Sequence, residues 1–108
     1  MNFPFCFTAD VDQVEPVIIG CPNNIVVTSD SNANGATVTW TAPTATDNDG
    51  AEPTVVSTSN PGSFFLIGST TVTYTFADTV GNTATCSFDV TVVGRSFTFN
   101  IHVMVLVY

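Results

Sequence analysis

Cysteine has the clearest chemistry in this chain, because paired thiols oxidise to a disulfide. The chain contains Cys6, Cys21 and Cys86. We pair Cys21 with Cys86, which closes a loop of about 66 residues and, in the chain-entropy model, stabilises the fold by roughly 4 kcal/mol. This free energy is comparable to the whole stability of a small domain. The pair therefore indicates where the folded unit begins and ends.

An odd number of cysteines leaves one thiol over, and we place Cys6 outside the domain. The residues alone leave two alternatives open: a pairing that uses Cys6, and two reduced, buried thiols in a cytosolic protein. Disulfides persist in oxidising compartments. The pairing that we favour thus predicts an extracellular protein.

Two acidic loops offer carboxylate and amide oxygens, the ligands that Ca²⁺ prefers. One is the run Asp47–Gly50, and the other begins at Asp78. The spacing does not match the longer calcium loop with its distal glutamate, and Asp and Asn are also favoured in ordinary turns. We favour plain turns without a cofactor, and name Asp47, Asp49 and Asp78 as calcium candidates. If Asp47 and Asp78 converge at one end of the fold, a cation site between modules would follow.

Catalysis has little support in these residues. The single histidine is His102, and a Ser/His/Asp or Cys/His system would depend on it. It lies in an apolar C-terminal run, Ile101–Tyr108, which is too short to span a bilayer. We predict that the chain is not an enzyme and that this segment does not insert into a membrane.

The charge balance limits the partners. Nine acidic residues stand against one basic residue, Arg95, for a formal net charge of −8. Such a chain has nothing with which to neutralise nucleic-acid phosphates or to dock on anionic lipid. We expect extracellular proteins or neighbouring repeats as partners, and no nucleic acid.

Apolar and polar residues alternate with period 2, which is typical of half-buried strands. The clearest runs are Ala36–Thr41, Thr71–Ala77 and Thr85–Val93, with threonine and serine on the outer face. Turn residues recur about every ten positions, as a sandwich requires. In the turn at Asp78, we expect Gly81 or Asn82 to take a positive φ. The sequence predicts an all-β protein of two packed antiparallel sheets, with about seven short strands.

The inward positions define a predicted core. Trp40 lies between the two paired cysteines and should pack on the disulfide. Tyr74 is mid-strand, and its hydroxyl should find a partner near the rim of the core. The predicted core residues are Trp40, Tyr74, Phe76 and Phe88.

Six blocks of the chain, in order, resemble the hyalin repeat, or HYR module, over roughly residues 16–93. The resemblance implies an immunoglobulin-like β-sandwich, usually present in tandem in extracellular or cell-surface proteins and associated with adhesion. The two cysteines of the family match Cys21 and Cys86. The blocks are Pro16–Ile25, Val38–Asn48, Pro61–Phe65, Gly68–Tyr74, Asp78–Asn82 and Cys86–Val92.

Two departures from the family pattern suggest a piece of a longer chain. Cys6 looks like a residue of a preceding repeat, and Gly94 leads into an apolar tail rather than another linker. We divide the chain into a linker or remnant (1–15), the HYR domain (16–93) and a tail (94–108) that is either one more strand or foreign to the domain. The expected function is a non-catalytic extracellular structural or adhesion module in a tandem array. The alternative is an accessory spacer or targeting domain of a multidomain extracellular receptor or enzyme.

Overall fold

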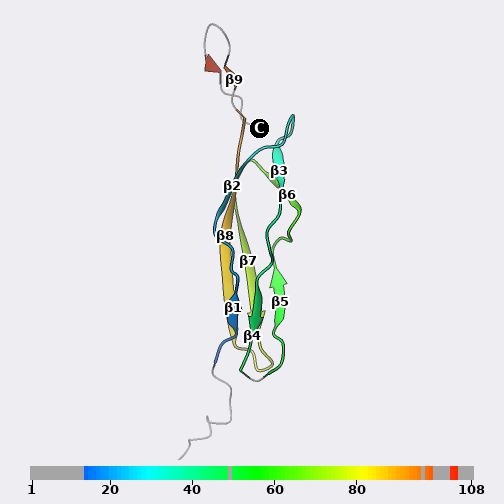
Figure 1. The fold of residues 1–108 in the computed structure, drawn as a ribbon, viewed down its shortest axis with the longest axis vertical. Helices are drawn as coiled ribbons and strands as arrows, with labels where there is room; N and C mark the ends of the chain where they lie inside the picture. Colours follow the sequence, from blue (N-terminus) through cyan, green and yellow to red (C-terminus); the bar gives the residue numbers. More distant parts are fainter. Residues whose placement is uncertain (1–13, 49, 96, 99–102, 105–108) are drawn as a thin grey trace, which may run out of the picture.

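The computed structural model describes residues 14–48, 50–95, 97–98 and 103–104. Within these residues the chain is all-β, and none of them is helical (Figure 1). The strands are β1 (Val17–Ile19), β2 (Ile25–Thr28), β3 (Gly35–Val38), β4 (Thr44–Thr46), β5 (Thr54–Ser57), β6 (Ser63–Leu66), β7 (Gly68–Ala77), β8 (Thr83–Val93), β9 (Phe97–Thr98) and β10 (Val103–Met104).

The strands form the two layers of an immunoglobulin-like β-sandwich, which confirms the predicted fold class. One layer is a continuous sheet in the order β2-β8-β7-β5, and the other consists of the pairs β1-β4 and β3-β6. The long hairpin of β7 and β8 pairs in register from Gly68 opposite Val92 to Ala77 opposite Thr83. The prediction that all strands pair in antiparallel fashion is wrong for one pair, because β2 runs parallel to β8.

This parallel pairing arises because the first part of the chain changes layers. β1 pairs with β4 in one layer, whereas β2 pairs with β8 in the other. Gly20, at the start of the crossing segment, has a φ of 78°, a conformation that glycine adopts without a steric penalty. Pro22 follows and lacks an N–H to donate to a ladder. Cys21 therefore lies where the chain crosses between the sheets.

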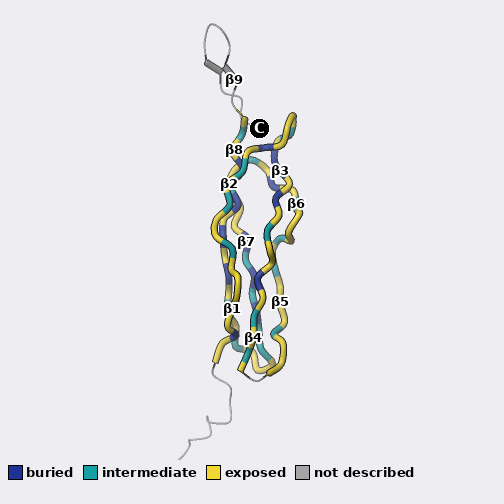
Figure 2. The backbone as a smooth tube through the Cα atoms, in the orientation of Figure 1, coloured by how far each residue is buried: buried dark blue, intermediate teal, exposed yellow. Residues whose placement is uncertain are grey.

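The core lies between the layers and follows the period-2 pattern. From Val72 onward in β7 and from Cys86 onward in β8, buried residues alternate with more exposed ones (Figure 2). The opposite layer contributes inward residues from β3 and β6. The buried hydrophobic residues are Ala36, Val38, Phe65, Val72, Tyr74, Phe76, Cys86, Phe88, Val90 and Val92.

The sandwich begins and finishes at opposite ends. The strand registers place β1 and the loops 47–53 and 78–82 at one end, which we call the N-terminal end (Figure 1). The loop 29–34 and the last residues of β8 lie at the C-terminal end, where Ser29 N donates to Val93 O at 2.9 Å. Arg95 Nε then donates to Ser29 O, also at 2.9 Å. This bond holds the chain where it leaves β8.

Beyond Arg95, β9 and β10 form a separate antiparallel ladder with each other. Neither strand is part of the sheets of the sandwich, and Figure 1 shows β9 beyond its end. The tail therefore does not extend the sandwich sheets in its described residues. The three-part division of the chain remains a prediction, and His102 and Cys6 lie outside the described residues.

Candidate functional site

The structure joins Cys21 to Cys86, with 5.8 Å between the two Cα atoms. Cys86 is buried on β8, whereas Cys21 is exposed on the crossing segment. The predicted disulfide thus ties the point where the first strands change layers to the centre of the continuous sheet.

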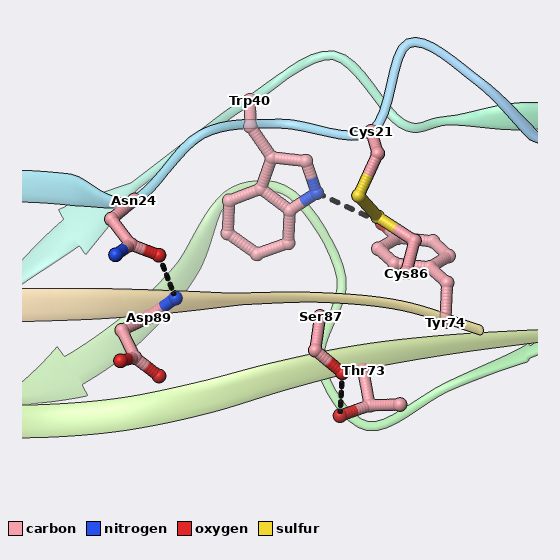
Figure 3. The surroundings of a disulfide bond; sticks show 8 residues. All are labelled: Cys21, Asn24, Trp40, Thr73, Tyr74, Cys86, Ser87 and Asp89. Atoms are coloured by element: carbon pink, nitrogen blue, oxygen red, sulfur yellow. Dashed lines mark hydrogen bonds between the residues drawn. A yellow bond between two sulfur atoms is a disulfide. The ribbon is translucent and has the colours of Figure 1, made fainter.

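Trp40 lies beside this disulfide (Figure 3). Its indole meets Phe88 edge-on, with 5.3 Å between ring centroids, and tilts against Phe65 at 6.0 Å. Its Nε1 donates a hydrogen bond of 2.9 Å to the hydroxyl of Tyr74. Trp40 is half-buried at the edge of the core, whereas Tyr74 and the two other predicted core residues, Phe76 and Phe88, are 3–4% exposed.

The sequence predicts a hydrogen-bond partner for the Tyr74 hydroxyl but does not indicate that this partner is Trp40. The two residues are 34 positions apart, and no local pattern connects them. The bond joins the polar atom of each ring to that of the other. We therefore interpret this hydrogen bond as a structural contact between the two layers, and not as part of a reactive site.

The turn at Asp78 is organised by its own carboxylate. Asp78 Oδ1 accepts from the backbone N–H of Val80 at 3.0 Å and of Asn82 at 2.9 Å. Asp78 Oδ2 accepts from Asn82 Nδ2 at 2.9 Å. Of the two residues considered for a positive φ, Gly81 takes it, at 96°. Side-chain to backbone bonds of this kind are the usual role of Asp in turns.

The other acidic loop lies at the same end of the sandwich. Gly50 N donates to Asp47 O at 3.1 Å, and the loop borders a shallow, open pocket lined by Ala45, Thr46, Asp47, Gly50, Ala51 and Glu52. Asp49 lies outside the described residues. Among the residues that the structure describes, no three acidic, histidine or cysteine side chains gather closely enough to hold a metal ion. Calcium binding at these loops stays an untested alternative to the plain turns that we favour.

The outer face of β7 and β8 carries paired polar side chains that the sequence does not reveal. In four register pairs, outward residues with hydroxyl or carboxylate side chains lie opposite each other, and we call these four pairs the hydroxyl ladder. Three pairs are hydrogen-bonded through their side chains: Ser69 with Thr91 at 2.8 Å, Thr71 with Asp89 at 2.7 Å and Thr73 with Ser87 at 3.0 Å. The fourth pair is Thr75 with Thr85.

This ladder faces away from the core. Figure 3 shows Thr73 and Ser87 on the side of the β7–β8 ribbons opposite to Trp40 and the disulfide. The alternation predicted that these hydroxyls point outward. It could not predict their pairing, because the register between two strands is not visible in either strand alone.

Charge is distributed unevenly over the fold. Asp89 is the only charged residue within a strand of the described sandwich, and its carboxylate accepts the Thr71 hydroxyl. The other described charges lie in loops or flanking segments. They are Glu15, Asp30, Asp47, Glu52, Asp78 and Arg95.

Comparison with known proteins adds independent information. Hyalin of Strongylocentrotus purpuratus is 46% identical over 84 residues, which cover 76% of this chain and 7% of that protein. Hyalin of Lytechinus variegatus is 39% identical over 89 residues, 82% of this chain and 17% of that protein. The sushi, von Willebrand factor type A, EGF and pentraxin domain-containing protein 1 of Rattus norvegicus is 39% identical over 88 residues, 80% of this chain and 2% of that protein.

The chain therefore spans less than a fifth of the length of each of these relatives. No solved structure gives a significant match. In the described part, no helix is long and apolar enough to cross a membrane. The sequence model of the HYR domain matches residues 11–92, and the chain belongs to the HYR domain family.

Proposed function

We propose that the chain is a non-catalytic structural or adhesion module of an extracellular protein, and one unit of a tandem array. The arrangement of the two ends carries this proposal. β1 begins at the N-terminal end of the sandwich and β8 finishes at the C-terminal end. Copies joined through these ends would follow one another in a line, with each sandwich acting as a rigid spacer.

The disulfide supports an extracellular location, because such bonds persist in oxidising compartments. The low share of the relatives that the chain covers supports a unit within a larger protein. Neighbouring repeats and other extracellular proteins are the proposed partners. In this setting, weak contacts are strengthened by repetition, since linked copies raise each other's effective concentration.

The non-catalytic part of the proposal is supported by how the reactive side chains are used. Cys21 and Cys86 are consumed in the disulfide. The Asp78 carboxylate holds a turn, and hydroxyls of the ladder bond one another. Side chains bonded in this way stabilise the fold, and their reactive atoms are not available to act on a substrate.

A binding assay with beads tests the adhesive role. Beads are coated with the full chain at graded densities and offered to decellularised extracellular matrix and to adherent cells. Attachment should rise more steeply than in proportion to density, because binding is multivalent. Beads coated with an unrelated protein of similar net charge are the control. Attachment no better than this control at every density would overturn the adhesive role.

One observation favours a second candidate, an accessory spacer or targeting domain. The rat relative has a name made of several other domain types, and the chain covers only 2% of it. A spacer needs no adhesive surface. Two results together would support this candidate. Two linked copies should remain straight and rigid in small-angle scattering, and beads coated with the chain should fail to attach.

A further inference from the structure

We propose that the open edge of β5 binds an extended segment of a partner protein, one that is apolar in its middle and carries a basic residue beside the apolar part. The segment adds a further strand to the β2-β8-β7-β5 sheet through backbone hydrogen bonds, which is a recurring mode of peptide recognition. The inference rests on the proposed function, because it names a surface through which an adhesive module binds. Three observations support it, and they concern backbone groups, apolar exposure and charge.

The first observation is that β5 has an open side. It is the last strand of its sheet, and among the described strands it pairs with β7 alone. Thr58 N donates to Thr73 O at 3.1 Å, and bonded positions alternate along an antiparallel pair. The backbone groups of Val56 therefore face β7, whereas the N–H and C=O groups of Val55 and Ser57 face the open side. An added strand would bond to these groups.

The sequence of β5 does not protect this edge. Proteins usually protect an open edge with a lysine, a proline or a bulge, because its free backbone groups can pair with another chain. The four residues of β5 are Thr-Val-Val-Ser, and they include neither a charge nor a proline. The edge therefore remains suited to strand addition.

The second observation is that β5 exposes apolar side chains on both faces. Val55 pairs with Phe76, which is 3% exposed, and paired residues share a face of the sheet. Val55 thus lies on the inner face, yet it is 52% exposed. Val56 lies on the outer face and is 72% exposed. An added apolar strand would cover both valines and remove apolar area from water.

Two other outer strands are better covered. β2 is the outer strand on the other side of the same sheet, and its residues Ile25 and Val27 pack against the core. β6 has Phe65 on its inner face, at 5% exposure. Figure 1 shows β6 along the same border as β5 but nearer the C-terminal end. β6 therefore does not extend over β5, which agrees with the exposure of Val55.

The third observation is charge, and it determines the class of partner. Glu52 lies two residues before β5, and Asp78 directly follows Ala77, which pairs with Thr54 at the start of β5. Glu52 and Asp47 both line the pocket at this end of the sandwich. Acidic residues thus surround one end of the open edge. They attract a basic residue on the added segment.

The same charges disfavour a second copy as the occupant. Each copy has a formal net charge of −8, so two β5 edges repel each other as they approach. A basic segment meets no such repulsion. Because β5 has only four residues, one strand addition gives weak binding, and an array of copies multiplies it.

Hydrogen exchange of the full oxidised chain, followed by NMR spectroscopy, tests the proposal. The probe is the capped peptide Lys-Thr-Val-Val-Val-Thr-Lys, and the same peptide with glutamate in place of both lysines is its matched control. In the free chain the amides of Val55 and Ser57 should exchange rapidly, and the amide of Val56 slowly. The basic peptide should slow exchange at Val55 and Ser57 by about tenfold or more at saturation. The acidic peptide should not slow it.

Variants of the chain test the charge and the apolar contact separately. Glu52→Gln should weaken binding of the basic peptide about threefold, because a surface charge pair is lost. Val55→Ser should weaken it about fivefold, because less apolar area is covered. Glu15→Gln is the matched control and should weaken binding less than Glu52→Gln does. It removes the same charge just before β1, which lies on the opposite border from β5 (Figure 1). Thermal melting verifies that each variant is folded.

Several results would contradict the proposal. They are no added protection of Val55 and Ser57 by the basic peptide, equal protection by the acidic peptide, and equal weakening by Glu52→Gln and Glu15→Gln. Protection that rises with the concentration of the chain alone would assign the edge to a second copy, and would also overturn the proposed partner.

The bead assay separates this inference from the proposed function. Beads that attach to matrix, although the basic peptide does not bind the chain, would leave the adhesive role standing and remove the β5 site. Beads that fail to attach, although the peptide protects Val55 and Ser57, would leave the β5 site standing and remove the adhesive role.

Discussion

Trp40 Nε1 donates a 2.9 Å hydrogen bond to the hydroxyl of Tyr74, and Tyr74 lies directly opposite Cys86 in the β7–β8 register. Trp40 belongs to the segment between β3 and β4, in the other layer of the sandwich. The two layers are thus joined at one level by a hydrogen bond between aromatic side chains and by a disulfide at the layer crossing.

The Trp40–Tyr74 bond should contribute measurably to stability. Tyr74→Phe removes the acceptor and leaves the indole N–H at a half-buried site, so we expect a loss of about 1 kcal/mol. Urea unfolding followed by tryptophan fluorescence measures it. Trp40→Phe and the double variant complete a thermodynamic cycle. A coupling energy indistinguishable from zero would show that the bond does not contribute.

The Cys21–Cys86 disulfide should contribute more than any single hydrogen bond. Replacing both residues with alanine should lower the free energy of unfolding by roughly 4 kcal/mol, because the unfolded chain regains the freedom of a long loop. Cys6→Ser is the matched control and should leave stability unchanged. Mass spectrometry without reduction should find Cys21 linked to Cys86 in that variant. A bond between Cys6 and either of the others in the wild-type chain would contradict the pairing.

Gly35 should not tolerate a side chain. A Cβ at this buried position in β3 would collide with the backbone oxygen of Phe65 and approach the ring of Phe64 at 2.9 Å. Gly35→Ala should therefore cost about 3 kcal/mol or more, since backbone atoms must move. Gly62→Ala is the control, because it has a φ of 88° but open space around it. Its cost should be about 1 kcal/mol, from backbone strain alone. Equal melting temperatures for the two variants would contradict the prediction.

The Asp78 carboxylate should act through the turn. Asp78→Ala removes three acceptor contacts and should destabilise the domain by about 1–3 kcal/mol with or without calcium. Thermal melting with calcium and with a chelator separates this role from cation binding. If the wild-type chain melts at a higher temperature with calcium, Asp47→Ala and Asp78→Ala should reduce that shift. A calcium shift unchanged in both variants would remove the candidate cation site.

The boundary of the folded unit can be tested by shortening the chain. Deletion of residues 96–108 should leave a folded domain, because β9 and β10 are not part of the sandwich sheets. Deletion of residues 95–108 also removes the Arg95 bond to Ser29 O, and should cost about 1 kcal/mol more. Circular dichroism and thermal melting report both effects. If the chain that lacks residues 96–108 fails to fold, the tail belongs to the domain.

Much of the fold could be predicted because strand signals are local. Alternation around Thr71–Ala77 and Thr85–Val93 identified β7 and β8 and placed Tyr74, Phe76 and Phe88 inside. Side chains on a strand point alternately to its two faces, so a run of seven residues already distinguishes core from surface. The acidic turn at Asp78 was predicted for the same reason, since its bonds span only four residues.

The tertiary structure alone decided how these local pieces meet. The layer change at Cys21, the parallel pairing of β2 with β8, the Trp40–Tyr74 bond and the pairs of the hydroxyl ladder all join residues that are distant in the chain. Such contacts depend on register and layer packing. Both are set by the free energy of the whole core and not by any one segment. The sequence by itself therefore determined an extracellular-type β-sandwich, and the tertiary structure determined which distant residues of its two layers meet.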